Sequence, residues 1–218
     1  MMRKLLAVAL LAGVLPAAAS AQGIGVGARI GTLGVGGEIA VGLSSRFEVR
    51  GGFGVLPVEI SRTYSDVEYT IEPTSPLANI GVDFYPLGTS LRIGAGMLFL
   101  SEPTTLGGEF TGTVEIGDRT YTGSEVGTLS GELDHGSRAP YAIVGFGSHT
   151  GRGIGLFLDL GAAFMSDPVL RLEATGPVAD DPQFQADLER ERAEAEEDAK
   201  DFLKVLPIAS IGIRIGIR

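Results

Sequence analysis

The chain has 218 residues, no cysteine and a formal net charge of −10 at pH 7. The lack of cysteine excludes a disulfide framework, a cysteine-ligated metal and a thiol nucleophile. The acidic balance argues against nucleic acid as a partner, because binding to nucleic acid depends on basic contacts to phosphate.

The first 21 residues carry the three features of a secretory signal peptide. Arg3 and Lys4 give a positive start, Leu5–Pro16 is an apolar run, and Ala19–Ala21 provides small residues for cleavage. We therefore expect residues 1–21 to be removed and the mature chain to begin at Gln22. A transmembrane anchor is the alternative, but a bilayer requires about 20 consecutive apolar residues. Export leaves 15 basic against 27 acidic residues, a net charge of −12.

The rest of the chain repeatedly alternates aliphatic residues with glycine or charge. At the carboxyl end, Ile211, Ile213, Ile215 and Ile217 alternate with glycine and arginine. Successive side chains of a strand point to opposite faces, so one face here is all isoleucine. Mean hydropathy is +0.24 and 33 residues are glycine. Weak hydrophobicity spread over short alternating segments is typical of transmembrane β-barrels.

Eight segments show this alternation and are predicted to be strands. The apolar phase shifts by one residue near Gly31–Thr32, which predicts a tight turn there, with Leu33 on the outward row of the second strand. The predicted strands are Gly23–Gly31, Leu33–Leu43, Phe47–Val55, Pro76–Tyr85, Leu91–Leu100, Ala139–Ser148, Gly153–Met165 and Pro207–Arg218.

The links between these strands are alternately short and long. The short links are Ser44–Arg46, Pro86–Ser90 and Thr150–Arg152, and the long ones are Pro57–Ser75, Ser101–Arg138 and Ser166–Lys204. In the first long link, Ile60–Thr63 and Val67–Ile71 are expected to extend the flanking strands. In the second, Thr113–Ile116 and Arg119–Thr122 flank a Gly-Asp turn and predict a hairpin.

The third long link contains a predicted acidic helix. Asp181 can cap a helix that has Pro182 at its first position. Gln183–Leu203 has helical composition, and Asp180–Lys204 holds ten acids and four bases. We expect a solvated helix packed lightly on a loop or on the barrel rim. A partner-binding or plugging helix is the alternative.

The predicted fold is therefore all-β. It is an eight-stranded antiparallel transmembrane up-and-down barrel formed by residues 22–218, with one acidic helix between strands seven and eight. Lipid cannot satisfy an open sheet edge, so a spanning sheet must close. A periplasmic lipocalin-like barrel is the alternative fold, and its aliphatic rows would point inward. Outer-membrane barrels keep short turns in the periplasm and long loops outside. This rule predicts periplasmic termini and places the loop 166–204 outside the cell.

The inward face of the barrel contains four acids and four bases. Eight strands leave room only for packed side chains or one small ligand, and buried charges are tolerated when they are paired. We therefore predict a salt-bridged lumen without a large pore; a narrow pore or the passage of a small ligand is the alternative. The inward charges are Arg29, Glu38, Glu48, Arg50, Asp83, Arg92, Asp159 and Arg214.

Candidate catalytic and metal-binding residues are few. His135-Gly136-Ser137 is similar in spacing to the His-x-Ser pair of an outer-leaflet lipid A deacylase, but its flanking residues do not match that family. A lipid A-modifying enzyme is thus an alternative only, and we expect a non-enzymatic protein without a cofactor. His149 is expected to be exposed beside a turn. The acidic run Glu196–Asp198 does not have the spacing of a calcium loop, so no metal site is predicted.

Two segments carry a family resemblance. They are Gly31–Glu38 leading into Leu43–Phe47, and Phe184–Leu203 ahead of the last strand. The chain resembles small bacterial outer-membrane β-barrel proteins, in particular an uncharacterised group with an acidic helix before strand eight. It is similar in architecture to OmpA- and OmpX-type barrels, but it ends on Arg218 rather than on Phe or Tyr.

The resemblance names no activity. From the barrel and its filled lumen we expect a structural or surface-interaction role in the cell outer membrane. We also expect contact with outer-membrane lipid and lipopolysaccharide, and insertion by the barrel assembly machinery, while the extracellular partner stays unknown.

Overall fold

The computed structural model describes residues 23–57, 60–64, 67–88, 90–101, 103–110 and 112–217. The predicted signal peptide, residues 1–21, and Arg218 lie outside the described residues. Among the described helices, none combines the length and the apolar content that would let it cross a membrane.

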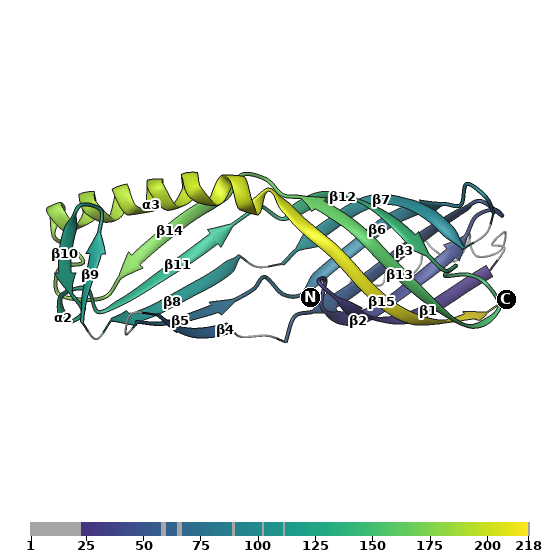
Figure 1. The fold of residues 1–218 in the computed structure, drawn as a ribbon, viewed down its shortest axis with the longest axis horizontal. Helices are drawn as coiled ribbons and strands as arrows, with labels where there is room; N and C mark the ends of the chain where they lie inside the picture. Colours follow the sequence, from purple (N-terminus) through teal and green to yellow (C-terminus); the bar gives the residue numbers. More distant parts are fainter. Residues whose placement is uncertain are drawn as a thin grey trace, which may run out of the picture.

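Eight antiparallel strands close into a barrel, which occupies the right half of Figure 1. The first strand pairs with the last, with Ile24 opposite Ile217 and Ile30 opposite Ile211, so the sheet has no free edge. The closed eight-stranded fold is confirmed. The strands, in the order in which they neighbour one another, are β1 (Gly23–Gly31), β15 (Val205–Ile217), β13 (Gly153–Phe164), β12 (Arg138–Phe146), β7 (Leu91–Leu100), β6 (Leu77–Phe84), β3 (Phe47–Val55) and β2 (Val35–Gly42).

The turn between β1 and β2 corrects one prediction. The second strand begins at Val35, and Leu33 lies in the turn, where it is buried rather than on the outward row. The backbone N–H of Gly34 donates to the carbonyl of Gly31 at 2.9 Å. Gly34 has a φ of +86°, a conformation that favours glycine. This turn reverses the chain at the end of the barrel and tucks Leu33 over the lumen.

A second sheet extends the molecule beyond the barrel, on the left of Figure 1. The sequence predicted its strands as loops or as extensions of barrel strands, and this was wrong. Ile60 pairs with Ile71, and Val67 with Phe110, so the first long link joins the second sheet instead of lengthening the barrel. The strands in sheet order are β14 (Val169–Ala174), β11 (Thr128–Asp134), β8 (Thr104–Phe110), β5 (Val67–Glu72) and β4 (Ile60–Tyr64). We call this sheet, with the elements packed on it, the extension.

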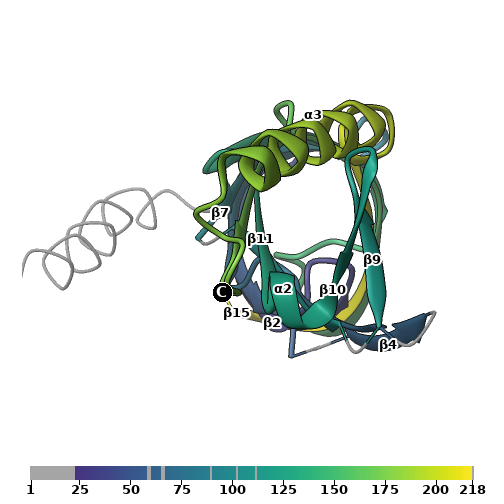
Figure 2. The ribbon, with the colours of Figure 1, turned by 90° about the vertical axis from the view of Figure 1, so that its left-hand side faces the viewer.

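The acidic helix and a small hairpin complete the extension. Helix α3 (Pro182–Leu203) runs along the sheet, and the carboxylate of Asp181 accepts hydrogen bonds from the N–H groups of Gln183 and Phe184, as predicted. The predicted hairpin is also present, as β9 (Thr113–Ile116) and β10 (Arg119–Thr122), followed by the short helix α2 (Gly123–Val126). Figure 2 views the extension from the end remote from the barrel, where this hairpin and the first turns of α3 lie. Between them lies a cluster made of Ile116, Val126, Phe184 and Leu188.

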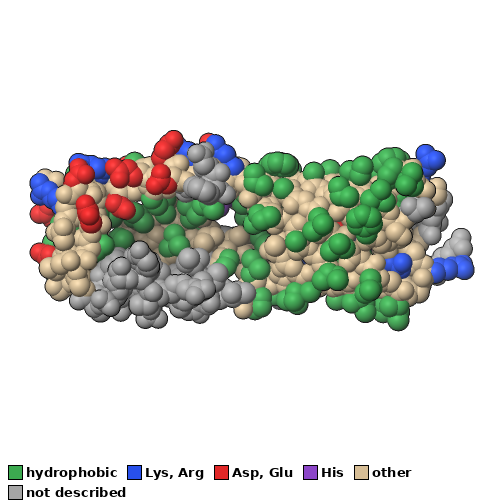
Figure 3. Space-filling view, viewed as in Figure 1, with side chains coloured by type: hydrophobic (Ala, Val, Ile, Leu, Met, Phe, Trp, Pro, Cys, Tyr) green, Lys and Arg blue, Asp and Glu red, His purple; other side chains and the backbone are tan. Residues whose placement is uncertain are grey.

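The outside of the barrel is lined with aliphatic side chains. Ile211, Ile213, Ile215 and Ile217 are each at least half exposed. Figure 3 shows apolar side chains distributed over the barrel, whereas acids and bases gather on the extension. The aliphatic rows therefore point away from the barrel axis. The lipocalin-like alternative, in which these rows would point inward, is wrong.

Candidate functional site

The lumen contains two layers, and the layer at the short-turn end is charged. All eight residues that the sequence assigned to the inward face lie inside the barrel, and none is more than 9% exposed. Their strands bring them from both halves of the chain into the lumen. Five of the eight, Glu38, Arg50, Asp83, Arg92 and Asp159, form one connected set of ion pairs, and His149 joins Glu48 to it. The other two, Arg29 and Arg214, have separate partners.

Two arginines bridge two aspartates at the centre of this layer. Arg50 contacts Asp83 at 3.1 Å and Asp159 at 2.9 Å, and Arg92 contacts Asp83 at 3.3 Å and also pairs with Asp159. Gly145 provides the space for this arrangement, since a Cβ there would lie 2.6 Å from both the Arg92 guanidinium carbon and an Asp159 oxygen. Each buried charge thus faces two opposite charges, which offsets the cost of removing it from water.

His149 was predicted to be exposed, and the structure corrects this. The side chain is 1% exposed and enters the lumen from the turn after β12. Its Nε2 lies 2.6 Å from Glu38 and its Nδ1 lies 2.9 Å from Glu48, while its ring packs on Phe157. The predicted strand Ala139–Ser148 ends one residue before His149. His149 nevertheless continues the odd-numbered inward row of Gly145 and Gly147, and this phase was the available signal.

Tyr85 is a second lumen residue that the sequence analysis did not assign, although it is the last residue of the predicted strand Pro76–Tyr85. It follows the inward Asp83 in phase, it is buried, and its hydroxyl donates to Glu48 at 2.6 Å. The hydroxyl of Thr150 donates to the other oxygen of Glu48 at 3.2 Å. The carboxylates of the charged layer are therefore held by turn residues as well as by strand residues.

Arg29 and Arg214 stand apart from the carboxylate cluster. Arg29 donates to the side-chain oxygen of Asn79 at 2.8 Å. Arg214 donates to the backbone carbonyls of Gly151 and Gly153. Arg214 thereby ties the last strand to the β12–β13 turn, and its role in the described structure is local.

The layer at the extension end of the lumen is apolar, which the sequence did not predict. Most of its side chains come from strands that also carry the charged residues: Leu98 and Leu100 follow Arg92 on β7, and Leu77 precedes Asp83 on β6. Near residue 100 both rows of β7 become apolar, so the alternation that identifies the inward face disappears there. The buried members are Leu33, Leu77, Leu98, Leu100, Ala139, Tyr141, Ile143, Ala163 and Ile208, with Leu56, Met165 and Leu206 packed against them. We call this set the leucine layer.

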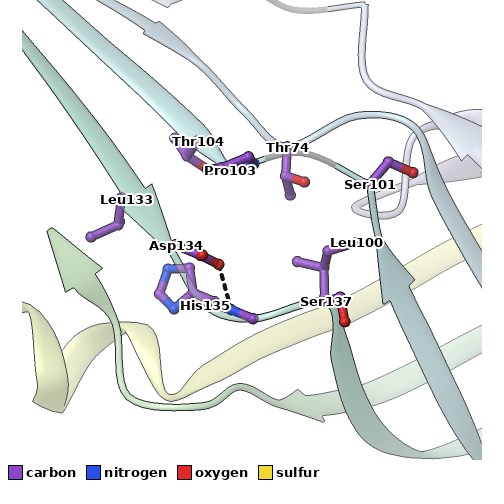
Figure 4. A pocket seen from close by; sticks show the side chains of 10 residues that line it. Thr74, Leu100, Ser101, Pro103, Thr104, Leu133, Asp134, His135 and Ser137 are labelled. Carbon is purple, nitrogen blue, oxygen red and sulfur yellow. Dashed lines mark hydrogen bonds between the residues drawn. The ribbon is translucent and has the colours of Figure 1, made fainter. Parts of the chain in front are cut away.

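A pocket of about 360 Å³ lies above the leucine layer, where barrel and extension meet. His135 and Ser137 both line it (Figure 4). The Ser137 hydroxyl points away from the His135 ring, whose Nδ1 lies 3.5 Å from the carbonyl of Ser166. Asp134 accepts a hydrogen bond from the N–H of Gly136 rather than orienting the imidazole. A serine nucleophile needs a base within hydrogen-bond reach and a group that orients this base, and this geometry provides neither.

Glu48, Asp83 and His149 each offer a ligand atom within 4.8 Å of the others. Their geometry alone would accommodate a metal ion. However, the Asp83 carboxylate already contacts two arginines, and Glu48 accepts from Tyr85 and Thr150. A further cation would have to enter beside two buried guanidinium groups, which electrostatics disfavours.

Several solved structures resemble this chain, among them two from Acinetobacter baumannii. CarO2 of Acinetobacter baumannii matches with a TM-score of 0.61 and 20% identity, over 89% of this chain and 98% of its own. CarO of Acinetobacter baumannii matches with a TM-score of 0.58 and 19% identity, over 88% of this chain and 96% of its own. No protein-family model and no curated protein matches the sequence. At 19–20% identity this likeness shows a shared fold.

Proposed function

We propose that this protein resides in the bacterial outer membrane and has a non-enzymatic, structural or surface-interaction role with a closed lumen. The observation that carries the proposal is the inverted barrel, with exposed aliphatic rows outside and ion pairs inside. Monomeric soluble proteins rarely expose large contiguous apolar surfaces. In a bilayer, the same rows would contact acyl chains, and closure of the sheet would satisfy every spanning backbone group.

The two layers of the lumen support the absence of a large pore. Ions entering from the short-turn end would meet Arg50 and Arg92, which are held on both sides by carboxylates. Ions entering from the other end would meet the leucine layer, and an apolar constriction opposes conduction by excluding water. A narrow pathway would require both layers to move.

A lipid A-modifying activity has weaker support. His135 and Ser137 both line the pocket beside the barrel rim, but the Ser137 hydroxyl points away from the His135 ring. The proposal of a non-enzymatic role rests on this geometry.

Single-channel recording tests the closed lumen. We expect the purified protein, reconstituted in a planar bilayer, to show no steady conductance, while a porin examined in parallel conducts. Protease protection of the reconstituted barrel controls for insertion. A steady, large conductance from the inserted protein would overturn the proposal.

The proposed orientation has the extension outside the cell. The short turns and the last residues of β15 lie at one end of the barrel and the extension lies at the other. Since the chain has no cysteine, Glu197→Cys on α3 and Ser45→Cys in a short turn are each unique labelling sites on exposed side chains. We expect a membrane-impermeant maleimide to label Cys at position 197 on intact cells, and at position 45 only after the envelope is opened. The reverse pattern would contradict this orientation.

A further inference from the structure

The excess negative charge of the protein is concentrated in the extension. Segments 57–75, 101–138 and 166–204 together hold 23 acidic and 8 basic residues, a net charge of −15. The remainder of the mature chain holds 4 acids and 7 bases, and all four acids are inside the lumen. Any ligand that approaches the extension therefore meets a strongly negative field, which attracts cations and repels anions.

The sheet of the extension has one apolar and one polar face. Paired residues share a face, so Leu106 on β8 and Leu172 on β14 lie on the same side as Gly131 between them. Leu133 pairs with Leu170 on that side as well. On the opposite face, Glu132 and Arg171 form a cross-strand ion pair at 3.3 Å.

Helix α3 covers only part of the apolar face. Leu129 and Leu172 pack against the buried cluster below the helix, and Leu170 is 6% exposed. Leu106 and Leu133, further from the cluster, are only half-buried. Figure 3 shows a hollow beneath the acidic helix in which apolar side chains are visible. We call this uncovered part of the face, with Leu106, Leu133 and the 360 Å³ pocket at its barrel end, the groove.

Figure 3 shows acidic side chains along the helix above this hollow. Glu194, Glu197 and Asp198 of α3 are exposed. An apolar floor beside an acidic wall is complementary to a segment with one apolar and one basic face, because the leucines accept apolar side chains while the carboxylates attract the cations.

We propose that the groove binds cationic amphipathic peptides. The inference deepens the proposed surface-interaction role and rests on it for its biological setting, but binding to the groove does not depend on whether the lumen conducts. The leucine floor supplies the apolar contact, and the net charge of the extension sets the sign of the partner.

The test uses the purified protein in nanodiscs of zwitterionic lipid, with empty nanodiscs as the reference. The probe is a fluorescent synthetic peptide made only of leucine and lysine at helical spacing, and anisotropy reports its binding. We expect saturable binding that weakens as salt is added. We expect no binding by the same peptide with glutamate in place of lysine, and none with serine in place of leucine.

Two neighbouring residues provide matched variants. Leu106→Gln changes the floor of the groove, whereas Thr105→Gln places the same side chain on the opposite, exposed face of β8. We expect Leu106→Gln to weaken binding about tenfold, since one buried leucine contributes about this much to an equilibrium constant, and Thr105→Gln to leave binding within about twofold. Glu194→Gln combined with Asp198→Asn is expected to weaken binding at least about threefold at low salt.

Heat-modifiable gel migration verifies that each variant keeps a closed barrel. If Leu106→Gln leaves the affinity for the peptide unchanged, the binding is general charge attraction, and the proposal that the groove binds the peptide is overturned. Failure of the peptide to bind would also overturn the groove as a peptide site. This includes the outcome in which the protein sediments as a dimer and Leu106→Gln dissociates that dimer, because the groove would then bind a second copy of the chain. A conducting lumen would instead refute the closed-barrel proposal and leave the peptide result standing.

Discussion

The barrel and the extension use the same alternating pattern in opposite senses. In β15 of the barrel, isoleucines face outward and Arg214 faces the lumen. In β11 and β14 of the extension, leucines face α3, while Glu132 and Arg171 face outward. The strand period is the same in both regions, so the pattern alone does not determine which face is buried. The difference teaches that the same strand pattern can bury either face, and it fits the proposed location, in which lipid would surround the barrel and water the extension.

The largest effect is expected from breaking the charged layer of the barrel. Arg92→Met leaves Asp83 and Asp159 with one guanidinium between them, and we expect a loss of about 3–5 kcal/mol in the free energy of unfolding. The measurement is the urea midpoint for loss of the heat-modifiable gel form. Arg46→Met, at an exposed turn position, is the control and should change little. Equal midpoints for the two variants would mean that the lumen pairs contribute nothing net.

A smaller effect is expected at the tip of the extension. The hydroxyl of Tyr121 donates to Asp187 at 2.7 Å, and Asp187 is only 1% exposed. Tyr121→Phe leaves this carboxylate with the weaker contacts to Gln183 and Arg119, at a cost of about 1–2 kcal/mol. Hydrogen exchange should become faster in the first turns of α3 and remain unchanged in the barrel. Thr120→Val on the same hairpin is the control and should leave exchange in α3 unchanged. Faster exchange in the barrel of the Tyr121→Phe variant would show that the barrel and the extension are not independent.

This prediction has a pH dependence. The hydrogen bond to Asp187 raises the pKa of Tyr121 to about 12. A raised pKa means that the folded tip favours the neutral phenol. The hydrogen bond from Tyr121 therefore stabilises the tip fully below about pH 10, and this stabilisation is lost as the pH rises through about 12. The difference in stability of the tip between the wild-type protein and Tyr121→Phe should therefore disappear as the pH approaches about 12.

The sequence predicted the barrel because its two faces have strongly different chemistry. Inward glycine and charge opposite outward isoleucine identify both the strands and the eight lumen charges. The leucine layer was missed because Met97–Leu100 is apolar on both faces, which removes the contrast. The extension strands were missed because a segment such as Thr104–Phe110 has few aliphatic residues, and its pairing depends on partners distant in the sequence.

The missed site residues have a common cause. His149 and Tyr85 lie just beyond the ends of β12 and β6 in the structure, yet both side chains enter the lumen. Following the inward row to the last residue of the predicted strand Pro76–Tyr85, and one residue past the strand that ends at Ser148, would have identified both. The geometry of the His135–Ser137 pair could not be obtained in this way, because it depends on how the barrel joins the extension.

The most direct test of the account is to measure whether lipid or water surrounds each of the two sheets. Because the chain has no cysteine, a spin label can be placed at Ile213→Cys on the barrel and at Ser130→Cys on the polar face of the extension. Power-saturation measurements on the protein in lipid vesicles compare collisions with oxygen, which concentrates in the bilayer, and with a water-soluble nickel chelate. We predict that oxygen dominates at position 213 and the nickel chelate at position 130. Free access of the nickel chelate to position 213 would contradict the account.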